Sequence, residues 1–211
     1  MKRGLFFVIE GPDGLGKSTQ ASILKDYLEC KGRRVLLTRE PGGSWFGDAI
    51  RNILLTSSTD HVLTPEAELF LFLADRANHV QQVIVPTLAS GMDVVCDRYV
   101  HSTYVYQSVG RGFNIEKLKE LHALATDHLY PDLSIILKGK GHRQEPLNSL
   151  DVLSSTYHDQ ISMAYDRLAD FIPNTHYING DQALRFVYND ISYLVDRELE
   201  KYSSHAPHES T

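Results

Sequence analysis

One short stretch constrains this chain more than any other: residues 11–19 read GPDGLGKST. The stretch follows the apolar run GLFFVIE and precedes QASILKDYLE, which has helical spacing. Gly11, Gly16, Lys17 and Ser18 match the pattern G-x-x-x-x-G-K-[ST] between an expected strand and an expected helix. In that setting the glycines let successive backbone N–H groups and the helix N-terminus point at a phosphate. The stretch therefore predicts a P-loop.

The side chains of this loop indicate a nucleoside triphosphate with Mg²⁺ as the ligand. We expect Lys17 to neutralise the outer phosphates and Ser18 to ligate Mg²⁺. The alternative is a glycine-rich turn that carries an incidental Lys-Ser pair. In the first interpretation the whole loop binds the nucleotide, through Gly11, Pro12, Asp13, Gly14, Leu15, Gly16, Lys17, Ser18 and Thr19.

Short β-rich runs alternate with longer segments of helical spacing along the whole chain. The runs LFFVIE, RRVLLT, MDVVCD, LSIIL and HYI are typical of strands, and each precedes a helical segment. This alternation predicts an α/β fold with a parallel sheet covered by helices on both faces. Thr64 and Pro65 form a start signal for one of the helices. The expected helices are 17–31, 46–56, 65–89, 114–127, 150–171 and 181–200.

Length and composition set the outer limits. A chain of 211 residues predicts one domain, over about 1–200, with a flexible tail at 201–211. No apolar stretch approaches the ~20 residues of a membrane span, so we expect no membrane association and a cytoplasmic location. The net charge of −6 argues against nucleic-acid binding. Cys30 and Cys96 are expected to be reduced thiols, with Cys96 buried in a strand.

Charged residues follow two of the expected strands. Asp97 and Arg98 end the run MDVVCDRY, and Arg39 follows RRVLLT, so all three are expected at the carboxyl edge of the sheet. There Asp97 can hold the hydration shell of Mg²⁺, and Arg98 can grip a second phosphate. The alternative for Asp97 and Arg98 is a strand-end turn with a surface ion pair. Residues 41–43, Pro-Gly-Gly, predict a turn that wraps an acceptor.

The segment ELFLFLADRANHV places Phe72 and Arg76 four residues apart on one side of a helix. A flat base can stack on Phe72 while Arg76 hydrogen-bonds its edge. The alternative is that Phe72 belongs to the core stripe of the helix and Arg76 lies at its solvent edge.

The motifs GPDGLGKST, TREPGG, LFLFLADR and DRYVHSTYVYQ occur in this order, and with them the chain resembles the thymidylate kinases of the nucleoside-monophosphate kinase family. The resemblance covers about the first two thirds of the chain. It implies a P-loop three-layer sandwich with a five-stranded parallel sheet flanked by helices. It also implies transfer of the terminal phosphoryl group of ATP to dTMP, with Mg²⁺, by a homodimer packed through helices.

The resemblance also assigns roles to single residues. It implies that Asp13 lies near the 3′-hydroxyl and phosphate of the acceptor, and that Lys17, Asp13 and Arg98 serve catalysis. The remaining implied contacts with dTMP are Arg39 and Arg98 at the phosphate, Phe72 stacked on thymine, Arg76 at its 4-oxo edge, Thr103 and Gln107 at N3, and Tyr106 at the sugar 2′ position.

The chain departs from the family pattern after LSIIL. Bacterial members usually continue into an arginine-rich lid that ends in D-R-x-E, whereas this chain reads KGKGHRQEPLNSLD. Gly14 shows that the P-loop has no arginine at that position, so a lid residue within about 138–150 has to supply the charge. Arg143 is the candidate catalytic residue. The alternative is a solvated basic loop.

Two other functions remain open from the sequence. The acceptor can be dUMP, another pyrimidine nucleotide or a nucleoside, because sequence alone does not weigh a methyl group. The chain can also be a nucleotide-binding protein whose altered lid has cost it catalysis. A GTPase is disfavoured because the chain has no N-K-x-D guanine motif.

Overall fold

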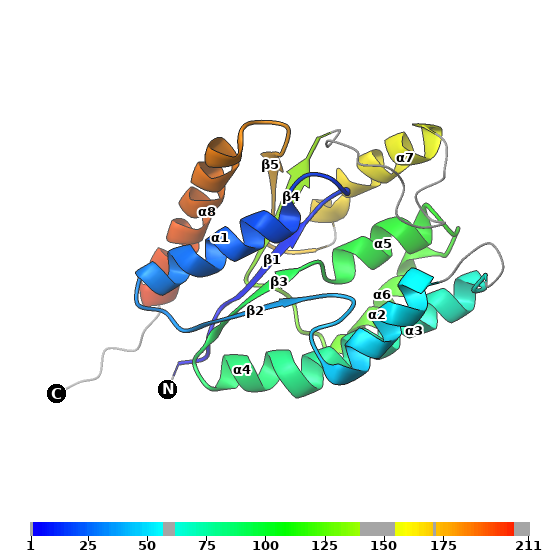
Figure 1. Cartoon of the computed structure of the whole chain (residues 1–211), viewed down its shortest axis with the longest axis horizontal. Helices are drawn as coiled ribbons and strands as arrows, with labels where there is room; N and C mark the ends of the chain where they lie inside the picture. Colours follow the sequence, from blue (N-terminus) through cyan, green and yellow to red (C-terminus); the bar gives the residue numbers. More distant parts are fainter. Residues whose placement is uncertain (1, 57–61, 140–154, 171, 205–211) are drawn as a thin grey trace.

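A computed structural model describes residues 2–56, 62–139, 155–170 and 172–204 of the chain (Figure 1). Its centre is a sheet of five parallel strands in the order β2-β3-β1-β4-β5. The expected α/β fold with a parallel sheet is therefore confirmed. The strands are β1 (Phe6–Glu10), β2 (Val35–Arg39), β3 (Asp93–Asp97), β4 (Leu133–Lys138) and β5 (Thr175–Asn179).

The strand that precedes the P-loop lies in the middle of this sheet. β1 pairs with β3 on one side, where Ile9 faces Asp97, and with β4 on the other, where Glu10 faces Ile136. Every residue of β1 is buried, which accounts for its continuous apolar run FFVI. The P-loop consequently begins where β3 and β4 also end, at the carboxyl edge of the sheet.

Two hydrophobic cores cover the two faces of the sheet. Successive side chains of a strand point to opposite faces, so Phe6 and Val8 belong to one core and Phe7 and Ile9 to the other. The helices α1 (Lys17–Cys30) and α8 (Leu184–Ser204) contribute to the core of Phe7 and Ile9. Figure 1 shows these two helices side by side against the sheet.

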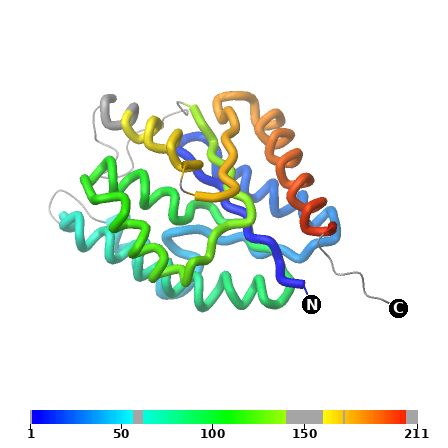
Figure 2. The backbone as a smooth tube through the Cα atoms, turned by 180° about the vertical axis from the view of Figure 1, so that it is seen from behind, coloured from blue at the N-terminus to red at the C-terminus, as the bar shows by residue number. Residues whose placement is uncertain are grey.

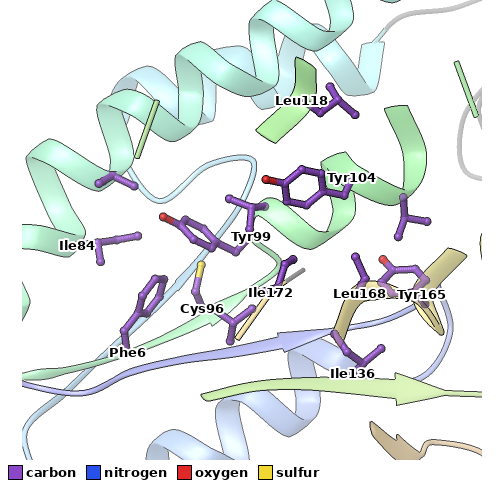
Figure 3. Close-up of a cluster of buried hydrophobic side chains, with 14 of the residues drawn as sticks. Phe6, Ile84, Cys96, Tyr99, Tyr104, Leu118, Ile136, Tyr165, Leu168 and Ile172 are labelled. Carbon is purple, nitrogen blue, oxygen red and sulfur yellow. The ribbon is translucent and has the colours of Figure 1, made fainter. Parts of the chain in front are cut away.

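The opposite face carries the longer series of helices. Its core includes Phe6, Cys96, Tyr99 and Tyr165. Figure 3 shows Cys96 between Phe6 and Tyr99, with Tyr165 farther along the cluster beside Leu168. Cys96 is fully buried in β3, as expected. The helices outside α1 and α8 are α2 (Trp45–Thr56), α3 (Pro65–His79), the π-helical turn η1 (Val80–Ile84), α4 (Val85–Ala89), α5 (Val100–Ser108), α6 (Ile115–Thr126), α7 (Ser155–Tyr165) and the 3₁₀ turn η2 (Leu168–Asp170).

Four helical features differ from the expectation. The helix expected over 150–171 ends at Tyr165, and a separate 3₁₀ turn, Leu168–Asp170, follows it. The helix expected over 65–89 is interrupted by the π-turn η1, although it begins at Thr64, whose side chain accepts a hydrogen bond from Ala67 N. The helix α5 was not expected at all. The last helix, expected to end at 200, continues to Ser204, where the Tyr202 hydroxyl donates to Arg3 O over 2.6 Å. Figure 2 shows this end of α8 close to the start of the chain.

Among the described helices, none is long and apolar enough to cross a membrane.

Candidate active site

The backbone of the P-loop requires glycine at position 11, the first glycine of the pattern. A Cβ atom on Gly11 would lie 2.4 Å from Leu137 O in β4, too close for any side chain. Gly16 ends the loop with φ 75° and ψ 24°, in the left-handed region, directly before α1 begins at Lys17. The N-terminus of α1, with its positive dipole end, thus faces the space enclosed by the loop.

A cavity of about 300 Å³ opens beside this loop, at the carboxyl edge of the sheet. It unites residues from four separate segments of the chain, the P-loop, the end of β2, α2 and the end of β3. The lining residues are Asp13, Gly14, Gly16, Lys17, Ser18, Thr19, Arg39, Glu40, Arg51, Asp97 and Arg98. Of the predicted loop residues, Gly11, Pro12 and Leu15 are outside this lining.

Lys17 is held against the P-loop itself. Its Nζ donates to Pro12 O over 2.8 Å and to Asp13 Oδ1 over 3.3 Å. Burial, followed by repulsion from Arg98, lowers the pKa of Lys17 to about 8. The ammonium group is therefore charged at neutral pH, and its contacts with the loop are ones that a phosphate can replace.

Ser18 and Asp97 meet at the floor of the cavity. The Ser18 hydroxyl donates to Asp97 Oδ2, while Asp97 Oδ1 is buried with no hydrogen-bond partner among the described residues. A hydroxyl and a carboxylate with a free oxygen are the hard ligands that Mg²⁺ prefers. Within the described parts of the chain, no group of three or more His, Cys, Asp or Glu residues is placed to hold a metal. The pair fits Mg²⁺ only if phosphates and water supply the other ligands.

Three arginines also line the cavity, and sequence reasoning identified only two of them. Arg39 is half exposed, 3.7 Å from Asp48, and Arg98 contacts Asp13 and Gly11 O. The third is Arg51, whose Nη1 donates to Pro41 O over 3.0 Å. Burial, followed by repulsion from Arg39, lowers the pKa of Arg51. This mutual repulsion makes the site favourable for a dianion.

Arg98 is also strained in its backbone, with φ 72°. Asp97 and Arg98 form no ion pair with each other in the described structure, so the surface-pair alternative is wrong.

Arg76 lies outside the lining of this cavity. It is fully buried: its Nε donates to Glu40 Oε2 over 2.7 Å, Nη1 to Thr103 Oγ1 over 3.0 Å and Nη2 to Tyr99 O over 3.0 Å. The alternative that placed Arg76 at a solvent edge is therefore wrong. Glu40 lines the cavity, so this network connects Arg76 with the cavity lining.

The other residues implied at the base also lie on α3 and α5, near Arg76. Phe72 and Tyr106 are half-buried, and Thr103 and Gln107 are buried. Gln107 Nε2 donates to Glu68 Oε1 over 2.7 Å, whereas Gln107 Oε1 is buried and has no hydrogen-bond partner within the described parts of the chain. An unpaired buried acceptor of this kind is costly unless a ligand pairs with it. None of these four residues belongs to the cavity lining.

Arg143, and with it most of the lid expected over 138–150, lies outside the described residues. Of that segment, Lys138 forms an ion pair with Asp166 over 2.6 Å. The roles predicted for Arg143 and for the other site residues stay predictions.

Comparisons with known proteins give a consistent family. Residues 9–191 match the sequence pattern of the family described as thymidylate kinase. The thymidylate kinase of Neorickettsia sennetsu is 37% identical over 174 residues, which are 82% of this chain and 85% of that protein. The thymidylate kinase of an Exiguobacterium species is 34% identical over 203 residues, covering 92% and 95%. The crystal structure of thymidylate kinase from Ehrlichia chaffeensis superposes with a TM-score of 0.76 at 30% identity, over 92% of this chain and 99% of that one.

Proposed function

The chain belongs to the thymidylate kinase family, and from this premise we propose how it phosphorylates dTMP to dTDP with ATP. As a member it is a nucleoside-monophosphate kinase, a transferase. The observation that carries the proposal is the cavity in which a P-loop and three arginines face each other. Such a cavity suits two phosphorylated substrates, a donor on the loop and an acceptor on the arginines.

The acceptor is held at both of its ends. We assign its phosphate to Arg39, Arg51 and Arg98, which line the cavity. The thymine ring then reaches toward α3 and α5, where the unpaired Gln107 Oε1 can accept the N3 hydrogen. Phe72 is the stacking partner, Arg76 and Thr103 complete the polar edge, and Tyr106 restricts the sugar.

Phosphoryl transfer in this arrangement needs no covalent intermediate. A phosphate oxygen of dTMP attacks the γ-phosphorus of ATP in line, and the bond to the β,γ-bridging oxygen breaks. The electron pair of that bond leaves with ADP, and dTDP is the second product. Lys17 and Arg98 neutralise the charge on the transferred group, while Asp13 contacts both cations and holds their orientation.

Ser18 and Asp97 are the residues that would hold Mg²⁺, because their oxygens meet and one carboxylate oxygen is unpaired. When bound, the ion supplies further positive charge to the phosphates of ATP. We assign to Arg143, in the lid over about 138–150, the neutralisation of the remaining negative charge of the transition state.

The organisation of the chain completes the proposal. We regard 1–200 as one domain, which acts as a homodimer in the cytoplasm. Support for the homodimer comes from large apolar side chains exposed on α2, α3 and α6, among them Ile53, Phe70 and Leu124.

The experiment measures ADP release with Mg-ATP against dTMP, dUMP, dCMP, AMP and thymidine, with parallel binding titrations. We expect turnover with dTMP to exceed that with AMP or thymidine by more than about 100-fold. AMP has a different base, whose edge leaves buried polar groups unsatisfied. Thymidine has the right base but no phosphate for the three arginines to bind. Faster turnover with dUMP than with dTMP would show that dUMP is the preferred acceptor. Binding of ATP and dTMP without turnover would contradict the kinase activity itself and favour a nucleotide-binding role.

A further inference from the structure

A fully buried carboxylate, Glu10, lies at the end of β1 directly behind the cavity. No motif described above includes it, and it does not line the cavity. Its two oxygens nevertheless accept three hydrogen bonds from the segment that carries Arg98, and Oε2 also accepts one from Gly11 N over 3.3 Å. Glu10 therefore connects the strand before the P-loop with the turn that presents the acceptor-binding arginine.

One oxygen of Glu10 fixes the backbone that follows Arg98. Glu10 Oε1 accepts from Tyr99 N over 2.8 Å and from Ser102 N over 3.1 Å. These two amides belong to the N-terminus of α5, which has no side-chain cap of its own. The carboxylate thus caps α5 from a neighbouring strand, and its charge suits the positive end of the helix dipole.

This cap explains how the strained conformation of Arg98 persists. A residue with φ 72° is unfavourable unless its surroundings fix it. Arg98 N donates to Ile9 O over 3.0 Å, and the Cys96 thiol donates to Arg98 O over 3.0 Å. With the next amide, Tyr99 N, bound by Glu10, the peptide groups on both sides of Arg98 are held.

The second oxygen of Glu10 orients the Arg98 side chain through two hydroxyls. Glu10 Oε2 accepts from Ser102 Oγ over 2.9 Å and from the Tyr165 hydroxyl over 3.3 Å. Arg98 Nη1 donates to the same two hydroxyls, over 2.9 and 3.5 Å, and lies 3.8 Å from Glu10 Oε2. Tyr165 reaches this point from α7, at the margin of the core cluster in Figure 3.

We propose that Glu10 is a positioning residue of the kinase, which fixes both the backbone and the guanidinium of Arg98 for the acceptor phosphate. The inference rests on the proposed function, in which Arg98 binds that phosphate. Glu10 does not contact either substrate in this assignment. Its contact with the P-loop, from Gly11 N over 3.3 Å, is longer than its contacts with Tyr99 N and Ser102 Oγ, over 2.8 and 2.9 Å. We therefore expect its effect to pass mainly through Arg98 and to fall on the acceptor more than on ATP.

The variant Glu10→Gln tests this assignment. An amide has one acceptor oxygen, so in either orientation its N–H₂ group faces a donor that the carboxylate now binds. We expect the KM for dTMP to rise about tenfold or more, the scale of a hydrogen bond to a charged group, and the KM for ATP to change less than about threefold.

The matched control is Asp93→Asn, a buried carboxylate at the opposite edge of the same sheet. Asp93 accepts from Leu5 N over 2.8 Å and pairs with Arg33, so its loss also disturbs a buried network. We expect Asp93→Asn to lower stability and leave both KM values unchanged. Equal effects of the two variants on the KM for dTMP would overturn the proposal.

A double-mutant cycle separates positioning from general damage. The affinity for dTMP is measured in the wild type, Glu10→Gln, Arg98→Ala and the double variant. We expect Glu10→Gln to weaken binding about tenfold in the wild type and by less than about twofold when Arg98 is absent. The same loss in both backgrounds would overturn the proposal. If Glu10→Gln does not fold, Tyr165→Phe, which removes one hydroxyl, takes its place in the cycle, and an unchanged affinity for dTMP overturns the proposal.

The wild-type arm distinguishes the two levels of failure. If the wild type binds ATP but not dTMP, the proposed function is wrong, and this inference is wrong with it. If the wild type binds dTMP and Glu10→Gln binds it with the same affinity, only the role of Glu10 is wrong.

Discussion

At the scale of single residues, Asp75 links the turn beside the cavity to pH. Its two carboxylate oxygens lie 3.3 and 3.2 Å from Gly42 N, in the turn that follows Arg39. Burial, followed by repulsion from Glu40, raises the pKa of Asp75 to about 7. The folded protein therefore keeps a proton that the unfolded chain loses near pH 4. This contribution to stability is complete below that pH and is lost as the pH rises to about 7.

Asp75→Asn removes this titration and keeps one acceptor oxygen for Gly42 N. We expect its stability relative to the wild type to increase between pH 5 and pH 8, by roughly 1 to 3 kcal/mol. Urea unfolding at the two pH values measures the change, with Glu66→Gln, an exposed acidic residue of the same helix, as the control. A stability difference that stays constant across this range would show that Asp75 does not titrate there.

The candidate site was predictable from sequence where its residues belong to short motifs. Lys17, Ser18, Arg39, Asp97 and Arg98 all follow strands or glycine-rich turns, and the structure brings them to one cavity. Arg51 and Glu10 were missed for physical reasons. Arg51 reaches the cavity because α2 packs against α3, a tertiary contact, and Glu10 reads in the sequence only as the polar end of a strand.

At the scale of elements, α6 depends on a cap that the structure makes explicit. Asn114 Oδ1 accepts from Glu116 N over 2.9 Å and from Lys117 N over 3.1 Å. We expect Asn114→Ala to lower the free energy of unfolding by about 1 kcal/mol, since two amides of the first turn lose their partner. Chemical denaturation checks this, against Asn189→Ala on the exposed side of α8. An equal loss in the two variants would argue against the cap.

Strands were predicted more reliably than helices in this chain, and the composition of each element explains why. All five strands were found, with shifts of one or two residues. The buried strands β1, β3 and β4 are largely apolar runs, and the partly exposed edge strands β2 and β5 keep short β-rich runs. The helix α5 was missed because it has buried residues on most of its circumference, including Val100, His101, Tyr104 and Gln107. The helix therefore has no separate polar and apolar faces, and its sequence shows no amphipathic pattern.

At the scale of the whole molecule, the exposed apolar residues of α2, α3 and α6 bear on the assembly state. Figure 1 shows these helices grouped on one side of the sheet. We expect sedimentation equilibrium to give twice the mass of a single chain, and Phe70→Glu to shift the protein toward the single-chain mass. Tyr193→Glu, at a comparably exposed position on α8, is the control. A single-chain mass at every concentration would contradict the homodimer.

The order of strands in the sheet has a consequence for how the protein is made. β1 precedes the other strands of the sheet in the sequence, but its two neighbours are β3 and β4, and the second of them ends at Lys138. Until then the strand that carries the P-loop has an open edge, and pairing over such long sequence separations is slow. The pairing of the central strand, from which the P-loop continues, is thus completed late in translation, after all residues of the cavity lining have been made. Nascent chains that stop before β4 expose an apolar edge to which chaperones or other chains can add.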